Sequence, residues 1–172
     1  QRLFIPGDTD FNEAFATAVA RAGVRRWFAH RGDPRALAAY ETNRRAEDAV
    51  IALMLEARGR LEELYASAVG LGAERLAARK AEVIADLRVR HRELREQNPG
   101  YQHHDAWINA PINNARLNTV DTYYQMVPGF EAKLELLAGD LPRFYESIAD
   151  LRRLNPDARR QRLSEAVLAR ST

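Results

Sequence analysis

The chain has 172 residues, of which 46% are hydrophobic and 29% are charged, a composition typical of a globular protein. Its formal net charge of +2 is too small to indicate a nucleic-acid-binding surface, and no basic cluster is interleaved with aromatic residues. The absence of cysteine excludes disulfides, thiolate zinc sites and cysteine nucleophiles, and no stretch approaches the ~20 apolar residues of a membrane span.

The periodic hydrophobicity of the chain is helical and predicts an all-α fold in a single domain over residues 1–172. A first helix is expected at residues 10–29, where large apolar side chains recur at helical spacing. Asp33-Pro34 places a capping side chain before a proline at the first helical position and so starts a second, long helix. Glycines separate that helix from a third at residues 73–97. The two long amphipathic helices predict an antiparallel helical hairpin over residues 33–97.

A loop at residues 98–112 leads into several shorter helices. Their expected spans are residues 112–126, 128–138, 141–153 and 156–169. The loop carries His103-His104-Asp105, which looks like a metal cluster, but neighbouring residues in a loop rarely bind one ion together. We therefore interpret it as a surface loop. His91, inside the third helix, is expected to be solvated or to stabilise the helix dipole.

The first helix carries the candidate metal ligand, Glu13. Its carboxylate shares a helix face with small residues, which would let a partner helix come close enough to share a metal ion. The residues by themselves favour another role, in which Asp10 is the N-cap and Glu13, three positions on, completes a capping box. The two roles are nearly exclusive, because a carboxylate that turns back to its own helix cannot also reach a metal.

Further motifs follow the Asn-Glu-x-x-Ala box at Asn12–Ala16 in a fixed order. They are PINNARL at Pro111–Leu117, Thr122-Tyr123, VPGF at Val127–Phe130 and GDLPRFY at Gly139–Tyr145. In this order they resemble the C-terminal half of the bacterial putative aminopeptidase family of zinc metallopeptidases. The resemblance runs from about Gln1 to about Leu163. The His-Glu-x-x-His motif of the family does not occur in the chain, and Gln1 stands where the residue after its second histidine would be.

The resemblance implies a zinc-dependent peptidase of which this chain is a C-terminal part. Two histidines upstream of Gln1 and Glu13 would hold the zinc, which activates water, with an upstream glutamate as the general base. The resemblance thus reverses the preference at Glu13, from helix cap to third ligand. The chain alone is then expected to bind zinc weakly and to be inactive.

The resemblance also implies a substrate-binding segment around PINNARL. Asn113, Asn114 and Arg116 are the expected substrate-binding residues, because amides pair with a peptide backbone and a guanidinium pairs with carboxylates. Tyr123 is the expected catalytic residue, a hydroxyl donor to the developing oxyanion. Capping or packing roles remain open for each of these residues, and Tyr124 offers a rival hydroxyl on another face.

The expected partners are a peptide substrate and the remainder of the same polypeptide before Gln1. The resemblance implies the cell envelope, on the periplasmic side, with a lipid anchor at an N-terminus that this chain lacks. A cysteine-free chain suits the cytoplasm equally. The alternative function is a non-catalytic helical interaction module, in which Glu13 is a cap and the hairpin docks a partner.

Overall fold

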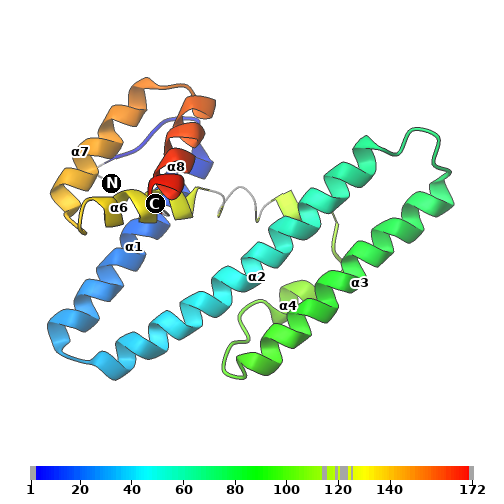
Figure 1. Cartoon of the computed structure of the whole chain (residues 1–172), viewed down its shortest axis with the longest axis horizontal. Coiled ribbons are helices and arrows are strands. Elements are labelled where there is room, and N and C mark those ends of the chain that lie inside the picture. The colour runs from blue at the N-terminus through cyan, green and yellow to red at the C-terminus, as the bar shows by residue number, and fades with distance from the viewer. Residues whose placement is uncertain (1–2, 114–115, 119, 121–123, 125, 171–172) are drawn as a thin grey trace. The chain divides into compact units, whose positions relative to one another are not determined.

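A computed structural model describes residues 3–113, 116–118, 120, 124 and 126–170 of the chain (Figure 1). The chain divides into two compact units. The first, here called the terminal unit, comprises Gln1–Asp33 and Thr122–Thr172, and the second, the hairpin unit, comprises Pro34–Asp121. The expectation of a single domain over residues 1–172 stays a prediction.

The terminal unit brings the two ends of the chain together in one helical cluster. Its elements are α1 (Thr9–Arg31), α6 (Val127–Leu136), α7 (Leu141–Ala149), the 3-10 helix η1 (Asp150–Arg153) and α8 (Pro156–Arg170). Helix α6 packs against α1, α7 and α8, so the second half of the unit is assembled around it. Helix α1 ends where the sequence predicts, because Gly32 adopts a left-handed conformation with φ of 64° and its N–H bonds to the carbonyl of Ala29.

Aromatic rings form the centre of the terminal unit. Phe11 and Phe15 of α1 meet Phe130 of α6 edge-on, with ring centroids 5.0 and 5.7 Å apart. Phe15 also stacks on Phe144 of α7 at 6.0 Å. The rings of Phe11, Phe130 and Phe144 are fully buried. Because aromatic burial of this kind dominates core energetics, the cluster fixes which face of α1 points inward.

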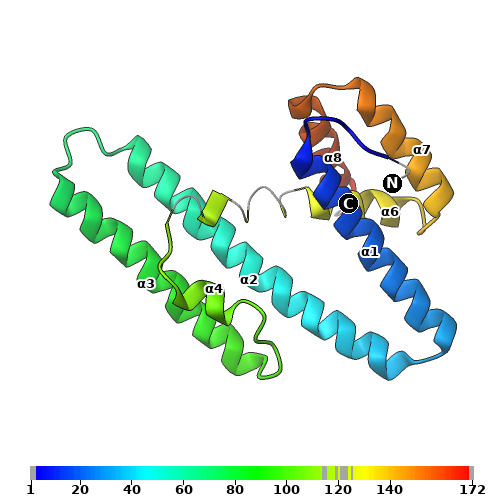
Figure 2. The same ribbon diagram turned by 180° about the vertical axis from the view of Figure 1, so that it is seen from behind.

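The hairpin unit contains the two long helices, α2 (Pro34–Ala66) and α3 (Ala73–Gln97), which lie side by side and antiparallel in both views (Figures 1 and 2). This confirms the predicted hairpin, including the helix start at Asp33-Pro34. Buried side chains line the seam between them: Val50, Ile51, Leu53, Met54, Ala57, Leu61, Leu64, Val83, Ile84, Leu87 and His91. Across its exposed edge Arg90 pairs with Glu56 at 2.5 Å, and Arg60 pairs with Asp86. Such solvated pairs contribute little to stability.

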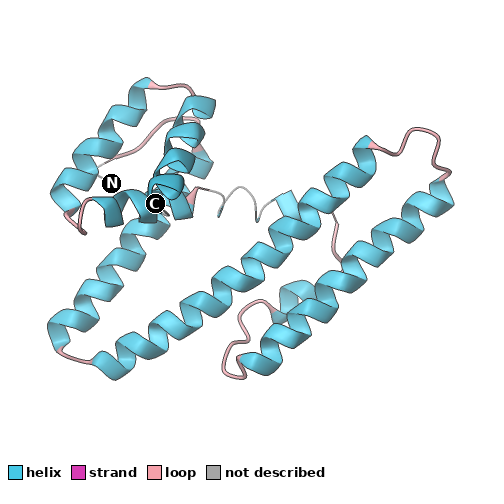
Figure 3. Ribbon diagram, in the orientation of Figure 1, coloured by secondary structure: helices cyan, strands magenta, loops and turns pink. Residues whose placement is uncertain are grey.

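The predicted loop at residues 98–112 contains a short helix, α4 (Asp105–Asn109). It forms because Ile108 is fully buried, and because Arg88 of α3 donates hydrogen bonds to the carbonyls of Ile108 and Ala110 at 3.3 and 3.2 Å. The described residues form helices and loops only (Figure 3), which confirms the all-α fold class.

Gly129 of α6 allows a close contact between α6 and α8 in the terminal unit. A Cβ atom at this position would lie 2.5 Å from Leu163 Cβ and 2.8 Å from the Leu163 carbonyl oxygen on α8. We expect Gly129→Ala to lower the free energy of unfolding by about 1–3 kcal/mol, because α8 must move away. Urea denaturation followed by circular dichroism measures the effect.

Gly23 supplies the matched control within the same unit. It lies in α1, and a Cβ atom there would meet nothing within 4 Å. Gly23→Ala should therefore stabilise the protein by roughly 0.5–1 kcal/mol through helix propensity alone. Equal effects of the two substitutions would contradict the close approach of α6 and α8.

Candidate functional site

Glu13 is an exposed residue in the second turn of α1, and its carboxylate makes no hydrogen bond or ion pair with any other described residue. The helix begins at Thr9, with Asp8 as its N-cap: the Asp8 carboxylate accepts a hydrogen bond from the N–H of Phe11 at 3.2 Å. The capping box of Asp10 and Glu13 is therefore wrong, because Asp10 already lies inside the helix. The carboxylate of Glu13 is not used by its own helix.

Asn12, the residue before Glu13, is buried. Its side-chain amide makes two hydrogen bonds to the backbone of Ile5: Nδ2 donates to the Ile5 carbonyl at 2.8 Å, and Oδ1 accepts from the Ile5 N–H at 2.9 Å. Both bonding groups of one residue are thus satisfied in a buried setting. Asn12 therefore fixes the segment that leads into α1, a role that the local sequence pattern does not indicate.

A buried ion pair holds the start of α1 against the C-terminal helix. Asp8 pairs with Arg159 of α8 at 2.7 Å, and the two side chains are 10% and 6% exposed. Arg159 also donates a hydrogen bond to the carbonyl of Leu154 at 2.8 Å and lies 5.7 Å from the ring centroid of Phe11. Further along, Arg21 pairs with Glu131 of α6 at 3.3 Å. Glu13 consequently stands on a helix that is anchored at two points.

The other face of α1 around Glu13 is less covered than the aromatic face. Ala16 and Thr17 are partly exposed and Ala20 is exposed, whereas Ala14, Phe15 and Ala18 are buried. The small residues expected beside the carboxylate therefore lie on the outer side of the helix.

The predicted substrate-binding segment begins with Asn113, which is exposed. Its Oδ1 accepts a hydrogen bond from the N–H of Arg116 at 2.9 Å, and its carbonyl accepts from Leu117, so Asn113 caps a helical turn. Arg116 donates hydrogen bonds to the carbonyls of Pro111 and Trp107 at 2.9 and 3.2 Å. Its guanidinium also lies over the Trp107 ring, 4.7 Å from the centroid.

The structure joins Asn113 and Arg116 in the hairpin unit and places Glu13 in the terminal unit. Asn114 and Tyr123 lie outside the described residues. Tyr124, the rival hydroxyl, is helical and partly buried. The substrate-binding roles of Asn113, Asn114 and Arg116 and the catalytic role of Tyr123 stay predictions.

The histidine-containing loop forms hydrogen bonds within the hairpin unit. His104 Nδ1 and the Tyr101 hydroxyl are 2.6 Å apart, and the rings of His103 and His104 meet edge-on at 4.9 Å. Asp105 pairs with Arg95 of α3 at 2.9 Å. Within the described ranges no group of three His, Asp or Glu residues is placed to hold a metal ion.

His91 is 3% exposed, so the expectation of a solvated position is wrong. Its Nε2 lies 3.4 Å from Asp105 Oδ1 and makes no hydrogen bond to any described residue. Burial lowers the pKa of His91 below its ordinary value, opposed by the Asp105 carboxylate and assisted by the Arg95 guanidinium. Burial also lowers the pKa of His104, and the neighbouring His103 adds to this effect. The unit thus favours neutral imidazoles at both positions.

In a comparison with protein families, residues 1–163 match the family described as putative aminopeptidase. The chain therefore belongs to the putative aminopeptidase family. A search of curated proteins gives no match, and neither does a search of solved structures. No helix in the described part of the chain is both long enough and apolar enough to cross a bilayer.

The cap assignment predicts unequal effects for two aspartates of the same turn. Asp8→Ala should lower the free energy of unfolding by about 3–5 kcal/mol, because Arg159 is left buried without its partner and α1 loses its cap. Asp10→Ala should cost less than about 1 kcal/mol, the loss of a favourable dipole interaction. Urea denaturation of both variants measures the difference. A larger loss in Asp10→Ala would restore Asp10 as the cap.

The buried imidazole of His91 and the half-buried imidazole of His104 predict a stability that falls in mild acid. Because the pKa values of His91 and His104 are lower in the folded than in the unfolded chain, the unfolded chain binds more protons below pH ~6.5. The free energy of unfolding should therefore decrease from pH 7 to pH 5. His91→Gln should reduce this decrease, which is measured by urea midpoints at each pH. An unchanged pH dependence in His91→Gln would show that His91 does not contribute.

Proposed function

We propose that this chain supplies Glu13 as the third protein ligand of a catalytic zinc ion in a peptidase. The other two ligands and the general base are the histidines and glutamate of a His-Glu-x-x-His motif upstream in the same polypeptide. One observation carries the proposal: within the Asn-Glu-x-x-Ala box of a putative aminopeptidase, Asn12 is used by the fold and Glu13 is not.

The properties of Glu13 fit a zinc ligand. A carboxylate oxygen is a suitable donor at about 2.0–2.2 Å from zinc, and the ligand must stand on a rigid element. The anchoring of α1 through Asp8 and Arg21 meets the second condition. The small side chains of Ala16 and Ala20 leave room for a partner helix beside the carboxylate. Zinc, when bound, supplies a Lewis acid that polarises a peptide carbonyl and activates water.

The segment at Asn113 is proposed to bind the backbone of the peptide. Oδ1 of Asn113 is used in capping, and no described residue accepts a hydrogen bond from its Nδ2, which leaves a donor for a substrate carbonyl. Asn114 is proposed to bind beside it. Arg116 donates hydrogen bonds to two backbone carbonyls and lies over the Trp107 ring. It therefore holds the segment around Asn113 in position, in addition to its proposed role in binding substrate. Tyr123 is proposed as the hydroxyl donor to the oxyanion.

The zinc assignment is tested in the longer polypeptide that contains His-Glu-x-x-His. Glu13→Gln should weaken zinc binding by at least about 100-fold, because even residues outside the ligand shell cost 10–100-fold when replaced. Peptide hydrolysis should be lost together with zinc. Competition with a chromophoric chelator measures the affinity, and the 172-residue chain alone should bind zinc more weakly than micromolar.

Asp10→Asn is the matched control, since it removes a carboxylate from the same helix two residues before the box. It should leave zinc affinity and hydrolysis unchanged. Unaltered zinc binding in Glu13→Gln, or an upstream sequence without His-Glu-x-x-His, would overturn the peptidase proposal and leave the helical interaction module.

A further inference from the structure

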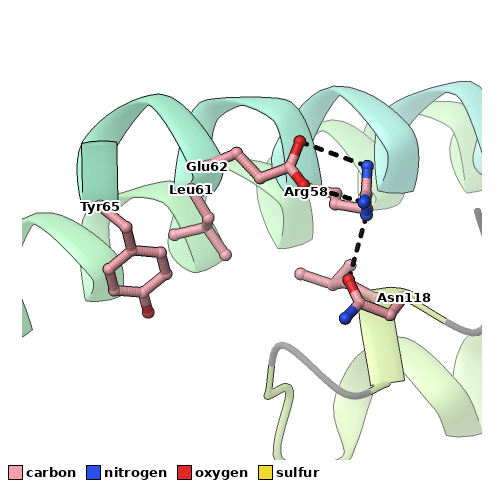
Figure 4. A pocket seen from close by; sticks show the side chains of 6 residues that line it. Arg58, Leu61, Glu62, Tyr65 and Asn118 are labelled. Carbon is pink, nitrogen blue, oxygen red and sulfur yellow. Dashed lines mark hydrogen bonds and ion pairs between the residues drawn. The ribbon is translucent and has the colours of Figure 1, made fainter. Parts of the chain in front are cut away.

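The hairpin unit contains a small pocket beside the proposed substrate-binding segment. Its volume is about 150 Å³, and its lining residues are Arg58, Leu61, Glu62, Tyr65, Leu117 and Asn118 (Figure 4). Leu61 of α2 and Leu117 are 3% and 1% exposed, so the bottom of the pocket is apolar. Tyr65 extends from α2 on one side, and Arg58 with Asn118 forms the other (Figure 4).

The charged residues at the mouth of the pocket neutralise each other. Arg58 pairs with Glu62, one turn further along α2, at 2.8 Å. The same guanidinium donates from Nε to Asn118 Oδ1 at 3.1 Å, which fixes the amide orientation. The mouth therefore carries no net charge to attract an acidic or basic ligand. The Nδ2 of Asn118 has no hydrogen bond to another described residue and can donate to a carbonyl at the mouth.

The volume of the pocket indicates which side chains it can hold. A leucine-lined cavity of about 150 Å³ in another protein is known to stay dry and to bind benzene, so this volume matches one branched aliphatic or phenyl group. Full burial of a leucine or phenylalanine side chain gives the favourable free energy that a glycine or alanine residue lacks.

The pocket lies close to Asn113, the residue that we propose to bind the backbone of the peptide substrate. The N–H of Leu117 bonds to the carbonyl of Asn113, so the pocket wall lies one helical turn, roughly 5.4 Å, from the proposed backbone-binding amide. Successive residues of an extended peptide advance about 3.3 Å. A peptide that accepts a hydrogen bond from Asn113 therefore reaches the pocket with a side chain one or two residues away.

We propose that this pocket binds one leucine- or phenylalanine-sized side chain of the peptide substrate and so gives the enzyme a preference for apolar residues. This proposal rests on the proposed function, because the bound side chain belongs to a substrate only if the protein is a peptidase. Tyr65 and Leu61 provide the apolar contacts, and Asn118 bonds the carbonyl of the residue at the mouth.

Binding can be tested on the 172-residue chain without zinc. N-acetyl-leucinamide, N-acetyl-phenylalaninamide and N-acetyl-glycinamide are titrated into ¹⁵N-labelled protein and followed by amide chemical shifts. We expect the first two probes to shift the amides of Tyr65, Leu117 and Asn118, and the glycine probe to bind at least about tenfold more weakly. Equal binding of the three probes, or shifts confined to other residues, would overturn the proposal.

Two variants and one control distinguish a loss of binding at the pocket from a loss caused by a disturbed fold. Tyr65→Ala removes one wall and should weaken the leucine probe about tenfold, and Asn118→Phe should close the mouth and abolish binding. Tyr40→Ala makes the same change on the same helix, away from this pocket, and should leave binding unchanged. A urea midpoint within error of the parent shows that each variant is folded. Undiminished binding in Asn118→Phe would contradict the pocket.

The longer polypeptide distinguishes failure of the pocket from failure of the proposed function. If it hydrolyses peptides, Asn118→Phe should lower the ratio of kcat/KM for leucine over glycine substrates, and an unchanged ratio would overturn the pocket. If the leucine probe binds but neither zinc nor hydrolysis is found, the pocket stands and the peptidase assignment fails.

Discussion

The carboxylate of Asp8 is the group on which the geometry of this protein depends most. It caps α1 and forms a buried ion pair with Arg159 of α8, so one side chain sets both where the helix begins and what it packs against. An unpaired buried charge is costly, which makes the two partners interdependent. Because successive helix residues are rotated by about 100°, Asn12 can lie on the buried side of α1 while Glu13 is exposed.

Asn12 and Glu13, the adjacent pair of the Asn-Glu-x-x-Ala box, therefore have different roles. Asn12 bonds both polar backbone groups of Ile5 and so fixes the incoming chain, while the carboxylate of Glu13 remains available to a ligand. In the hairpin unit the same separation appears around Asn113, where Oδ1 caps a turn and Nδ2 is available. In our proposal, the pocket at Leu117 adds a preference for apolar side chains to a segment whose amides bind any peptide backbone.

The fold was largely predictable because long helices leave a strong periodic signal. The start at Asp33-Pro34 and the stop at Gly32 follow local rules of capping and φ, and both are confirmed. The N-cap of α1 was not, since Asp8 and Asp10 are equally good caps by type, and only the ion pair with Arg159, distant in sequence, decides between them. Burial of His91 and formation of α4 likewise depend on tertiary contacts that no local pattern encodes. The family was predictable from ordered motifs, whereas the pocket needed the structure.

The most direct test of the proposed zinc site is to locate zinc in a longer polypeptide in which His-Glu-x-x-His precedes this chain, as proposed above. An anomalous difference map at the zinc edge would locate the ion relative to α1. The account predicts a carboxylate oxygen of Glu13 about 2.0–2.2 Å from the zinc, together with two histidine nitrogens. A zinc ion whose protein ligands do not include Glu13 would contradict it.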